Sequence, residues 1–347
     1  MTTSRMRAEI GEQPEALRRT IEALLPRVPE IERLAAETRQ VLFIARGSSD
    51  NAAVYGRYLI ESHAGRLATL AAPSIATAYN RKLDLDGVLA VAISQSGKTE
   101  EIVETLAWAK ECGARTVAVT NGQGSPLAEA ADVALITLAG DELAVPATKT
   151  YTTQLAALAV LGLGLGIGQD PADLRRVPDE VEGLIRATEA SPALGRIVEA
   201  LAQVPGAVVS GRGIAFGTAL ELALKIKEAC YLHAMGLSYA DLLHGPIAVV
   251  DDQTPALLVA AENSPTLSGT IALAERVRGA GSEAFGFGGG SGLAQASTAA
   301  LPGPDLPEWV APLGLIVPGQ IMVENLARRL GIDPDVPRGL NKVTQTD

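Results

Sequence analysis

A chain of 347 residues, 47% hydrophobic and 20% charged, has a globular rather than a disordered composition and is long enough for two domains. Its net charge of −11, with no cluster of Lys and Arg, argues against nucleic acid and anionic membranes as partners. The two cysteines, Cys112 and Cys230, lie in apolar, helix-like stretches and are expected to be reduced core residues of a cytoplasmic protein.

The first residues, Met1 to Gln13, are polar and charged and predict no signal peptide. From Glu9 to Ala36 the pattern predicts one or two amphipathic helices, with Pro14 near a helix start and two further prolines as breaks. The longest apolar run, Leu155 to Ile167, is shorter than the ~20 residues of a membrane span. It therefore predicts a buried helix at a domain or subunit contact.

Strands that alternate with helices follow in the first half of the chain. A helix is expected from Ala52 to His63, and the predicted strands cover residues 41–45, 87–93, 115–120 and 132–136. This alternation implies parallel pairing in a doubly wound α/β sheet. Because ligands of such sheets bind at the carboxyl ends of the strands, the turns Gly47-Ser48-Ser49 and Ser94-Gln95-Ser96 are candidate binding loops.

The second of these turns carries the strongest functional signal. Three hydroxyls and a glutamine amide, from Ser94, Gln95, Ser96 and Thr99, surround the start of a helix that continues through Glu100. Free backbone N–H groups and the positive end of the helix dipole make such a place suitable for a phosphate. The alternative is an ordinary serine N-cap without a ligand, but a cap needs one hydroxyl and three are present.

The second half of the chain repeats the first with an offset of 166 residues. Arg46-Gly47 recurs as Arg212-Gly213 after an apolar strand, and the same offset relates residues 91–93 to 257–259. This constancy indicates two copies of one fold in tandem. Because Ala260-Ala261-Glu262-Asn263 replaces the hydroxyl-rich turn, we expect one phosphate site, in the first copy.

Two other kinds of site are not supported by the sequence. The glycine-rich stretch from Gly211 to Gly217 has one residue too many for a dinucleotide fingerprint, and no suitable acid follows it. The three histidines, His63, His233 and His244, lack the paired spacing of metal ligands. We therefore predict neither a nucleotide cofactor nor a metal.

A charged stripe in the second half is open to two interpretations. Glu221, Lys225 and Glu228 fall on one face of an otherwise apolar helix. The stripe either faces solvent, steadied by a Glu221–Lys225 pair worth a few tenths of a kcal/mol, or is partly enclosed, which would raise a carboxylate pKa and suit proton transfer. Downstream, His244 before Gly245-Pro246 is either a helix cap or an acid/base group.

Several motifs spread along nearly the whole chain together resemble the tandem sugar isomerase (SIS) domain family, in particular the isomerase half of glucosamine-6-phosphate synthase. They are Glu9-Ile10-Gly11-Glu12-Gln13-Pro14, Arg46-Gly47-Ser48-Ser49, Ser94-Gln95-Ser96-Gly97, Val145-Pro146-Ala147-Thr148-Lys149, Ala223-Leu224-Lys225-Ile226-Lys227-Glu228, His244-Gly245-Pro246 and the C-terminal tail. The resemblance implies two SIS domains, each a flavodoxin-like parallel sheet flanked by helices. The expected divisions are an N-terminal helical segment 1–35, a first domain 36–168, a linker helix 169–200, a second domain 201–335 and an active-site tail 336–347.

The resemblance also implies roles for individual residues. The residues that would hold the substrate and its phosphate are Ser48, Ser49, Ser94, Gln95, Ser96, Thr99, Val145 and Ala147. Glu228 would move a proton between C1 and C2 of the sugar, with Lys225 beside it. His244 would open the sugar ring, reaching the site from the neighbouring subunit of a homodimer. Lys342 would lie over C1 and C2, where a lysine stabilises an oxyanion or forms an imine.

Departures from the synthase pattern point to a particular reaction. Met1-Thr2-Thr3 leads directly into the isomerase part, so no glutaminase domain is expected, and Ala147 replaces a serine that touches the sugar. The ending Lys342-Val343-Thr344-Gln345-Thr346 looks more like the stand-alone deaminases of this family. We therefore expect an enzyme of amino sugar metabolism that converts glucosamine 6-phosphate to fructose 6-phosphate and ammonia.

Two alternatives to the deaminase are compatible with the same residues. Another 6-phosphosugar aldose–ketose isomerase, or a deglycase acting on fructosamine 6-phosphate, would use the same groups. A non-catalytic sugar-phosphate sensor is the alternative from a different class, because a fold does not fix a function.

Overall fold

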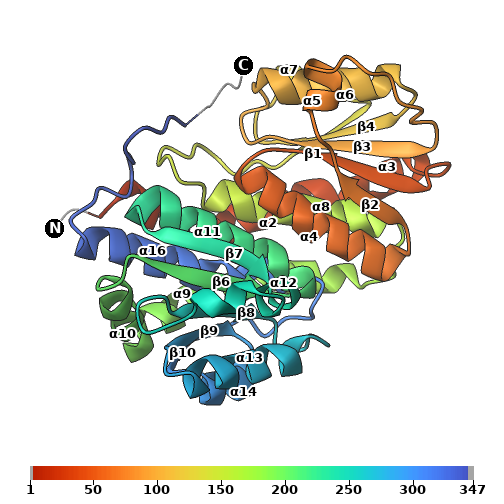
Figure 1. Ribbon diagram of the computed structural model, residues 1–347. Coiled ribbons are helices and arrows are strands. Elements are labelled where there is room, and N and C mark those ends of the chain that lie inside the picture. Colours follow the sequence, from red (N-terminus) through yellow and green to blue (C-terminus); the bar gives the residue numbers. More distant parts are fainter. Residues whose placement is uncertain (1–2, 343–347) are drawn as a thin grey trace. The chain divides into compact units, whose positions relative to one another are not determined.

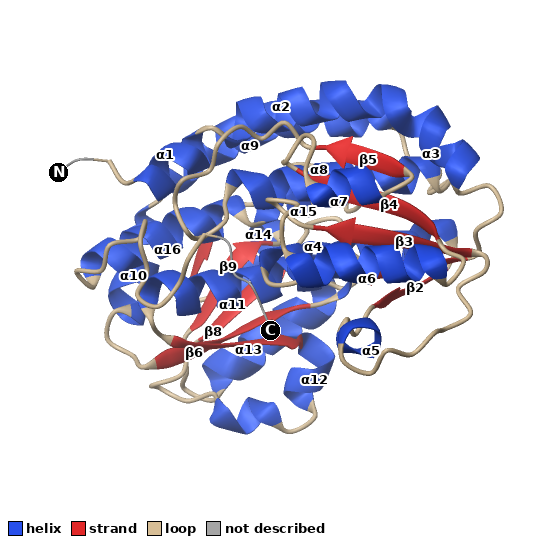
Figure 2. Cartoon of the chain, turned by 90° about the horizontal axis from the view of Figure 1, so that it is seen from above, coloured by secondary structure: helices blue, strands red, loops and turns tan. Residues whose placement is uncertain are grey.

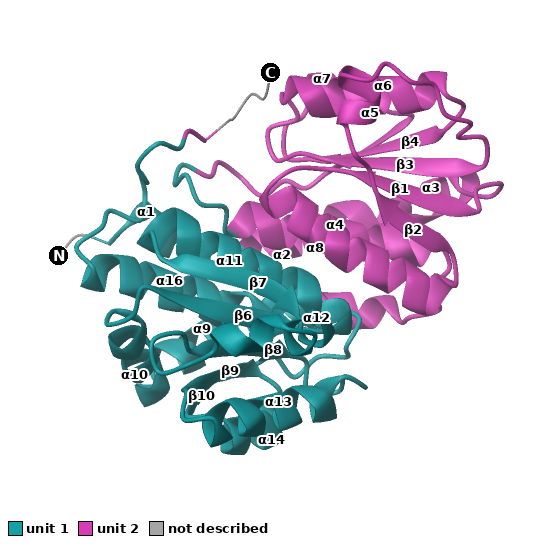
Figure 3. Cartoon of the chain, viewed as in Figure 1, with its two compact units in different colours: residues 1–14, 143–148, 176–340 teal, residues 15–142, 149–175, 341–347 magenta. Residues whose placement is uncertain are grey.

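The computed structural model describes residues 3–342, and the chain folds into two compact units that alternate along the sequence (Figure 3). Within the described residues, unit 1 comprises 3–14, 143–148 and 176–340. Unit 2 comprises 15–142, 149–175 and 341–342. The predicted tail motif beyond Lys342, residues 343–347, lies outside the described part of the chain.

Unit 2 contains a five-stranded parallel sheet in the order β2-β1-β3-β4-β5. Its strands are β1 (Gln40–Ile44), β2 (Leu67–Leu70), β3 (Val88–Ile93), β4 (Arg115–Thr120) and β5 (Val133–Ile136). The four predicted strands are confirmed to within one residue at each end. Strand β2 was not predicted, because it is four residues long and buries only Ala68, so it lacks an apolar run.

Helices cover both faces of this sheet (Figures 1 and 2). On one face lie α5 (Ser74–Thr77), α6 (Glu100–Glu111) and α7 (Pro126–Ala130). The other face is covered by α4 (Ser48–Leu59), continued by a π-helical turn (Ile60–Ala64), and by α8 (Lys149–Gly164), which packs on α3 (Val28–Leu34). The helix predicted from residue 52 thus begins four residues earlier, directly at the Gly47 turn.

The apolar run 155–167 falls largely within α8, nearly all of whose residues are buried, so the predicted buried helix is confirmed. No helix in residues 3–342 is long and apolar enough to cross a membrane. The predicted N-terminal helical region consists of α1 (Arg5–Gly11), α2 (Gln13–Leu24), a 3-10 turn (Leu25–Arg27) and α3. As expected, Pro14 is near a helix start, and the two further prolines occupy first turns, where no backbone N–H is needed.

Unit 1 contains a second parallel sheet, in the order β10-β9-β8-β6-β7. Its strands are β6 (Gly206–Gly211), β7 (His233–Ser238), β8 (Ala256–Ala260), β9 (Ala284–Gly288) and β10 (Ala299–Leu301). An offset of 166 residues carries β1, β2 and β5 onto the first residues of β6, β7 and β10. The strand order is also the same in both sheets, so the predicted tandem repeat of an α/β fold is confirmed.

Helices α11 (Phe216–Cys230) and α16 (Val317–Arg329) pack together on one face of the second sheet, and α13 (Leu267–Gly279) and α14 (Gly290–Ala296) cover the other (Figure 1). The segment expected as a linker forms α9 (Pro171–Glu189) and α10 (Pro192–Leu201). The shorter helical elements of this unit are a 3-10 turn (Gly213–Ala215), α12 (Tyr239–Leu243), a 3-10 turn (Pro246–Val249) and α15 (Pro312–Leu315).

Candidate active site

Two of the predicted binding loops lie next to each other in unit 2. They follow β1 and β3, which pair in parallel with Ile44 opposite Ala92, so both strands end at the same edge of the sheet. The Arg46 guanidinium joins the loops by a two-pronged ion pair to Glu101 in the first turn of α6, with N···O distances of 2.9 and 2.8 Å. The structure therefore brings the Ser48-Ser49 turn and the Ser94–Thr99 turn together.

The hydroxyls after β3 organise the turn itself and do not cap α6. Ser94 Oγ accepts the Gly97 N–H (3.3 Å), and Ser96 Oγ accepts the Lys98 N–H (3.2 Å). Thr99 is the N-cap residue of α6, yet its side chain makes no capping hydrogen bond. Since a hydroxyl that accepts a hydrogen bond still has a proton to donate, all three hydroxyls keep a donor for a bound oxyanion.

Backbone donors add to this arrangement. Within the described residues, the N–H groups of Gln95, Ser96 and Thr99 have no hydrogen-bond acceptor. In the neighbouring loop, Gly47 adopts φ +59° and starts α4 at Ser48, so that helix also points its first N–H groups out of the sheet edge. Two helix N-termini and several hydroxyls at one edge form an arrangement suited to a phosphate group.

A glycine fixes the shape of the turn after β3. Gly97 has φ +65°, and a Cβ on it would lie 2.1 Å from Ser125 Oγ. Ser125 is itself occupied, because its Oγ accepts the Ala128 N–H and caps α7. Only glycine fits between these groups without displacing the cap.

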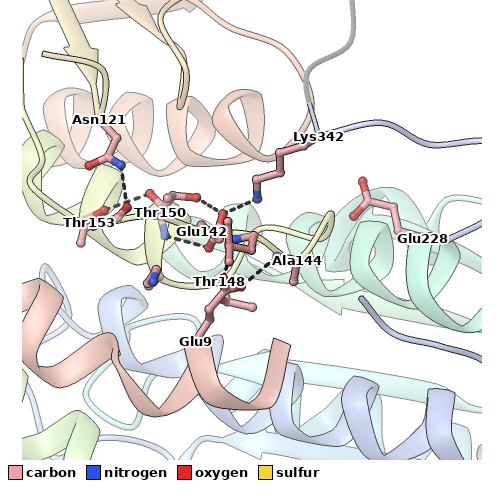
Figure 4. Close-up of polar contacts among 12 residues, drawn as sticks. Glu9, Asn121, Glu142, Ala144, Thr148, Thr150, Thr153, Glu228 and Lys342 are labelled. Atoms are coloured by element: carbon pink, nitrogen blue, oxygen red, sulfur yellow. Dashed lines mark hydrogen bonds and ion pairs between the residues drawn. The ribbon is translucent and has the colours of Figure 1, made fainter. Parts of the chain in front are cut away.

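A further residue of unit 2 was not predicted from the sequence. The Glu142 carboxylate is buried, and its Oε2 lies 2.7 Å from the ammonium of Lys342, the predicted tail lysine (Figure 4). The same carboxylate accepts the N–H (3.2 Å) and the hydroxyl (2.5 Å) of Thr150. Glu142 follows Gly140 and Asp141 in a loop, where an acid is usually a solvated surface residue, so its place just before the Val145–Lys149 motif was the only available signal.

In unit 1, the charged stripe of α11 is enclosed. The side chains of Glu221 and Lys225 are 0% and 1% exposed, whereas that of Glu228 is 22% exposed. The Lys225 ammonium donates to Glu228 Oε2 and lies 3.5 Å from Glu221 Oε1. The solvent-facing interpretation of the stripe is therefore wrong. The positive charge of the buried Lys225 is compensated by the two carboxylates beside it. Lys225 also orients Glu228, the member of the group that reaches solvent.

The remaining predicted residues of unit 1 are less engaged. His244 follows α12 as its C-cap residue, its side chain is exposed, and within the described residues its imidazole makes no hydrogen bond. Its backbone N–H donates to the Asp241 carbonyl. Val145 is half-buried and donates its N–H to the Asp335 carbonyl (3.0 Å), and Ala147 is also half-buried. Unit 1 by itself does not join His244 to the Glu228 group by hydrogen bonds, so its role stays a prediction.

Two further kinds of chemistry would need a metal site or a reactive cysteine. Among residues 3–342, no group of three or more His, Cys, Asp and Glu side chains is placed to hold a metal ion. Cys112 and Cys230 are both free thiols. Burial raises the pKa of Cys230 to about 12, which is typical of a core cysteine and not of a nucleophile.

Comparison with known proteins identifies the family. The SIS domain model matches residues 34–163, the part that contains the Ser48-Ser49 and Ser94–Thr99 turns. A solved structure from Silicibacter pomeroyi, named a "putative phosphosugar isomerase", is 33% identical, covers 96% of this chain and 100% of its own, and superimposes with a TM-score of 0.86. The chain belongs to the SIS phosphosugar isomerase family. The SIS fold expected for both halves is therefore confirmed.

Two further members of the family are informative. The C-terminal domain of glucosamine-fructose-6-phosphate aminotransferase from Francisella tularensis is 28% identical, with a TM-score of 0.87, and the match covers 97% of this SIS chain and 99% of that domain. Glutamine–fructose-6-phosphate aminotransferase (isomerizing) from Pyrococcus horikoshii is 34% identical over 344 residues, 97% of this chain and 57% of that protein. The chain thus spans a little over half the length of the curated relatives that it matches.

Proposed function

We propose that this SIS protein is a glucosamine-6-phosphate deaminase, which converts glucosamine 6-phosphate and water to fructose 6-phosphate and ammonia. The observation that carries the proposal is the α11 group, in which Glu228 is held by a buried lysine and still reaches solvent. A carboxylate in this position suits proton transfer between adjacent sugar carbons.

In this proposal the turns after β1 and β3 anchor the substrate. The hydroxyls of Ser94, Ser96 and Thr99, together with the free N–H groups of that turn, would bind the 6-phosphate. Ser48 and Ser49 stand at the start of α4 beside this turn and would complete the contacts. Because the phosphate is fixed at C6, the reacting carbons C1 and C2 of the bound sugar are also held in a defined position.

The proton transfers follow from the groups available. His244 would open the pyranose ring, giving the C1 aldehyde with a hydrogen and an amine on C2. Glu228 would take the C2 proton and return it to C1, while the aldehyde oxygen gains one proton and the amine nitrogen loses one, so that C1 becomes CH2OH and C2 becomes an imine. Water adds to this imine, and ammonia leaves as the C2 ketone forms. The Lys342 ammonium would stabilise the negative charge that develops on oxygen during the transfer.

The amino sugar is favoured as substrate by the chemistry of the relatives. The names of the Pyrococcus and Francisella proteins describe an aminotransferase acting on fructose 6-phosphate. A site that combines a 2-ketose phosphate with ammonia and shifts a proton from C1 to C2 is, read in reverse, a deaminase. The same Glu228 could serve both directions.

The test is ammonia release coupled to detection of fructose 6-phosphate, from purified protein supplied with glucosamine 6-phosphate. Stoichiometric appearance of both products is the expected result. Conversion of glucose 6-phosphate to fructose 6-phosphate without any ammonia from the amino sugar would contradict the deaminase and identify an aldose–ketose isomerase.

A second candidate is the aldose–ketose isomerase or the fructosamine-6-phosphate deglycase. It is favoured by Glu228 itself, because a base that moves a proton between C1 and C2 does not require an amine on C2. A panel of 6-phosphosugars, analysed by product, separates these activities from deamination. A sensor would instead show an increase in melting temperature with a phosphosugar and no turnover of any member of the panel.

A further inference from the structure

The Glu142 carboxylate is held in place by groups other than the lysine. Glu142 lies in the loop between β5 and α8, with its side chain fully buried. Thr150, in the first turn of α8, donates its N–H to Oε1 and its hydroxyl to Oε2. A carboxylate held by two donors at a helix N-terminus is well stabilised as an anion and cannot change rotamer without losing both bonds.

Lys342 is the adaptable partner in this pair. Its side chain is 25% exposed, and its ammonium lies 2.7 Å from Glu142 Oε2 (Figure 4). An exposed ion pair is worth little, because both long side chains must be ordered. Here the acid is already ordered and buried, so forming the pair costs only the freedom of the lysine.

We propose that Glu142 is a positioning residue that docks the amine of the tail lysine Lys342 at a fixed point of the site. The catalytic consequence of this docking rests on the proposed function, in which Lys342 stabilises charge on the sugar oxygen. The docking itself does not rest on the proposed function. A flexible four-carbon side chain that lost this anchor would spend little time in the productive place, and small misplacements of a catalytic group cost about 100-fold in rate.

The first experiment measures the docking without turnover. The full-length protein is trace-labelled with acetic anhydride, and acetylation of each lysine is followed by mass spectrometry. The Glu142→Gln variant is expected to acetylate at Lys342 about 5- to 10-fold faster than the wild type, because the amine is released from its carboxylate. Lys82, an exposed lysine of the same unit, serves as the internal reference.

Matched variants make this measurement specific. Asp141→Asn removes the same charge one residue away, from an exposed side chain, and should leave Lys342 labelling unchanged. Glu142→Asp keeps the charge on a shorter side chain and should restore part of the protection. Melting temperatures of all variants show whether they are folded. Equal labelling of Lys342 in folded Glu142→Gln and in the wild type would overturn the proposal.

The second experiment asks whether Glu142 acts through Lys342. Glu142→Gln should lower kcat with glucosamine 6-phosphate by about 10- to 100-fold and leave KM nearly unchanged, since the phosphate loop is intact. The double variant with Lys342→Met should be no slower than Lys342→Met alone. If the two losses multiply instead, Glu142 acts independently of the lysine and the positioning role is wrong.

The two experiments fail separately. If no phosphosugar is turned over, the proposed function fails, while the labelling result still decides whether Glu142 docks Lys342. If deamination is observed but Lys342 is acetylated equally fast in Glu142→Gln and in the wild type, the proposed function stands and the inference about Glu142 is wrong.

Discussion

Glu228 differs from its two charged neighbours on α11 in reaching solvent. Glu221 and Lys225 are buried, and their charges compensate each other within the helix, whereas the exposed part of Glu228 is available to a substrate. A group that is anchored on one side and open on the other can change its proton without unfolding its surroundings. This is the residue on which the proposed reaction depends most directly.

Replacing Glu228 by Gln should therefore abolish most turnover without preventing binding. The amide keeps the shape and the contact with Lys225 but cannot accept the C2 proton, so kcat should fall by about 10²- to 10⁴-fold. The increase in melting temperature caused by the phosphosugar should persist, because the phosphate loop is unchanged. Steady-state kinetics and thermal shift assays measure the two effects.

Glu275→Gln provides the matched control, since Glu275 is an exposed carboxylate on α13 of the same unit. Its activity should equal that of the wild type. Near-normal turnover in Glu228→Gln would exclude Glu228 as the base.

At the residue scale, the sequence could place side chains on a helix face but could not decide their burial. The spacing of Glu221, Lys225 and Glu228 was visible, yet burial depends on tertiary packing, since α11 contacts β6, β7 and the much later helix α16. Glu142 was missed for a related reason. Its partners Thr150 and Lys342 are brought to it by folding, and two adjacent acids in a loop give no pattern that marks one of them as buried.

The turn between β3 and α6 is an element whose geometry depends on one glycine. Gly97→Ala would place a methyl group 2.1 Å from Ser125 Oγ at a residue with φ +65°. We expect a loss of about 1–3 kcal/mol of stability from this overlap, together with loss of the melting-temperature increase caused by phosphosugar. Urea unfolding and thermal shift assays check the two outcomes.

Gly65→Ala separates steric overlap from backbone strain. Gly65 has a similar φ of +62° in the same unit, but nothing lies within 4 Å of the position of its Cβ. It should lose about 1 kcal/mol from the left-handed backbone alone and keep its response to phosphosugar. An equal response to ligand in both variants would mean that the shape of the Gly97 turn is not needed for binding.

At the element scale, apolar runs predicted the strands well, whereas the residue composition of the turns predicted their geometry poorly. Strands β1, β3, β4 and β5 were recognisable because each is an apolar run that buries at least two residues, whereas β2 buries one. The hydroxyls of Ser94 and Ser96 were expected around the helix start, but their use as acceptors for Gly97 and Lys98 depends on backbone dihedrals that composition does not specify.

The stability of the whole molecule should depend on pH through carboxylates such as Asp132, whose contribution is lost on acidification. Burial raises the pKa of Asp132, but hydrogen bonds from Lys110 and from the Thr116 N–H and hydroxyl outweigh it and leave the pKa below its ordinary value. A carboxyl whose folded-state pKa is lowered contributes stability that is complete above its unfolded value, near 3.8, and is lost as pH falls through the folded value.

Asp132→Asn should accordingly lower stability by about 1 kcal/mol at pH 7, and the difference from the wild type should shrink below pH 3.8. Urea titrations followed by circular dichroism at several pH values measure it. Asp86→Asn, at an exposed position of the same unit, should lie close to the wild type throughout. A gap between wild type and Asp132→Asn that widens on acidification would contradict the sign of this argument.

At this largest scale, the repeat of 166 residues predicted both sheets and their equivalence. What it could not predict is how the chain distributes its segments between the units. Residues 3–14 and 143–148 belong to unit 1 although most of their neighbours in sequence belong to unit 2. Such exchanges depend on long-range packing, for instance of α1 on α16, and leave no periodic signal.

The duplicated sheet also has an evolutionary consequence. Once a fold occurs twice in one chain, selection needs to preserve a binding turn in only one copy. The turn after β3 carries hydroxyls, while the equivalent turn at the end of β8 reads Ala260-Ala261-Glu262-Asn263. The two copies differ in chemistry, because the charged stripe of α11 lies in the second. Among descendants of this gene, the turn after β8 should vary far more freely than the turn after β3.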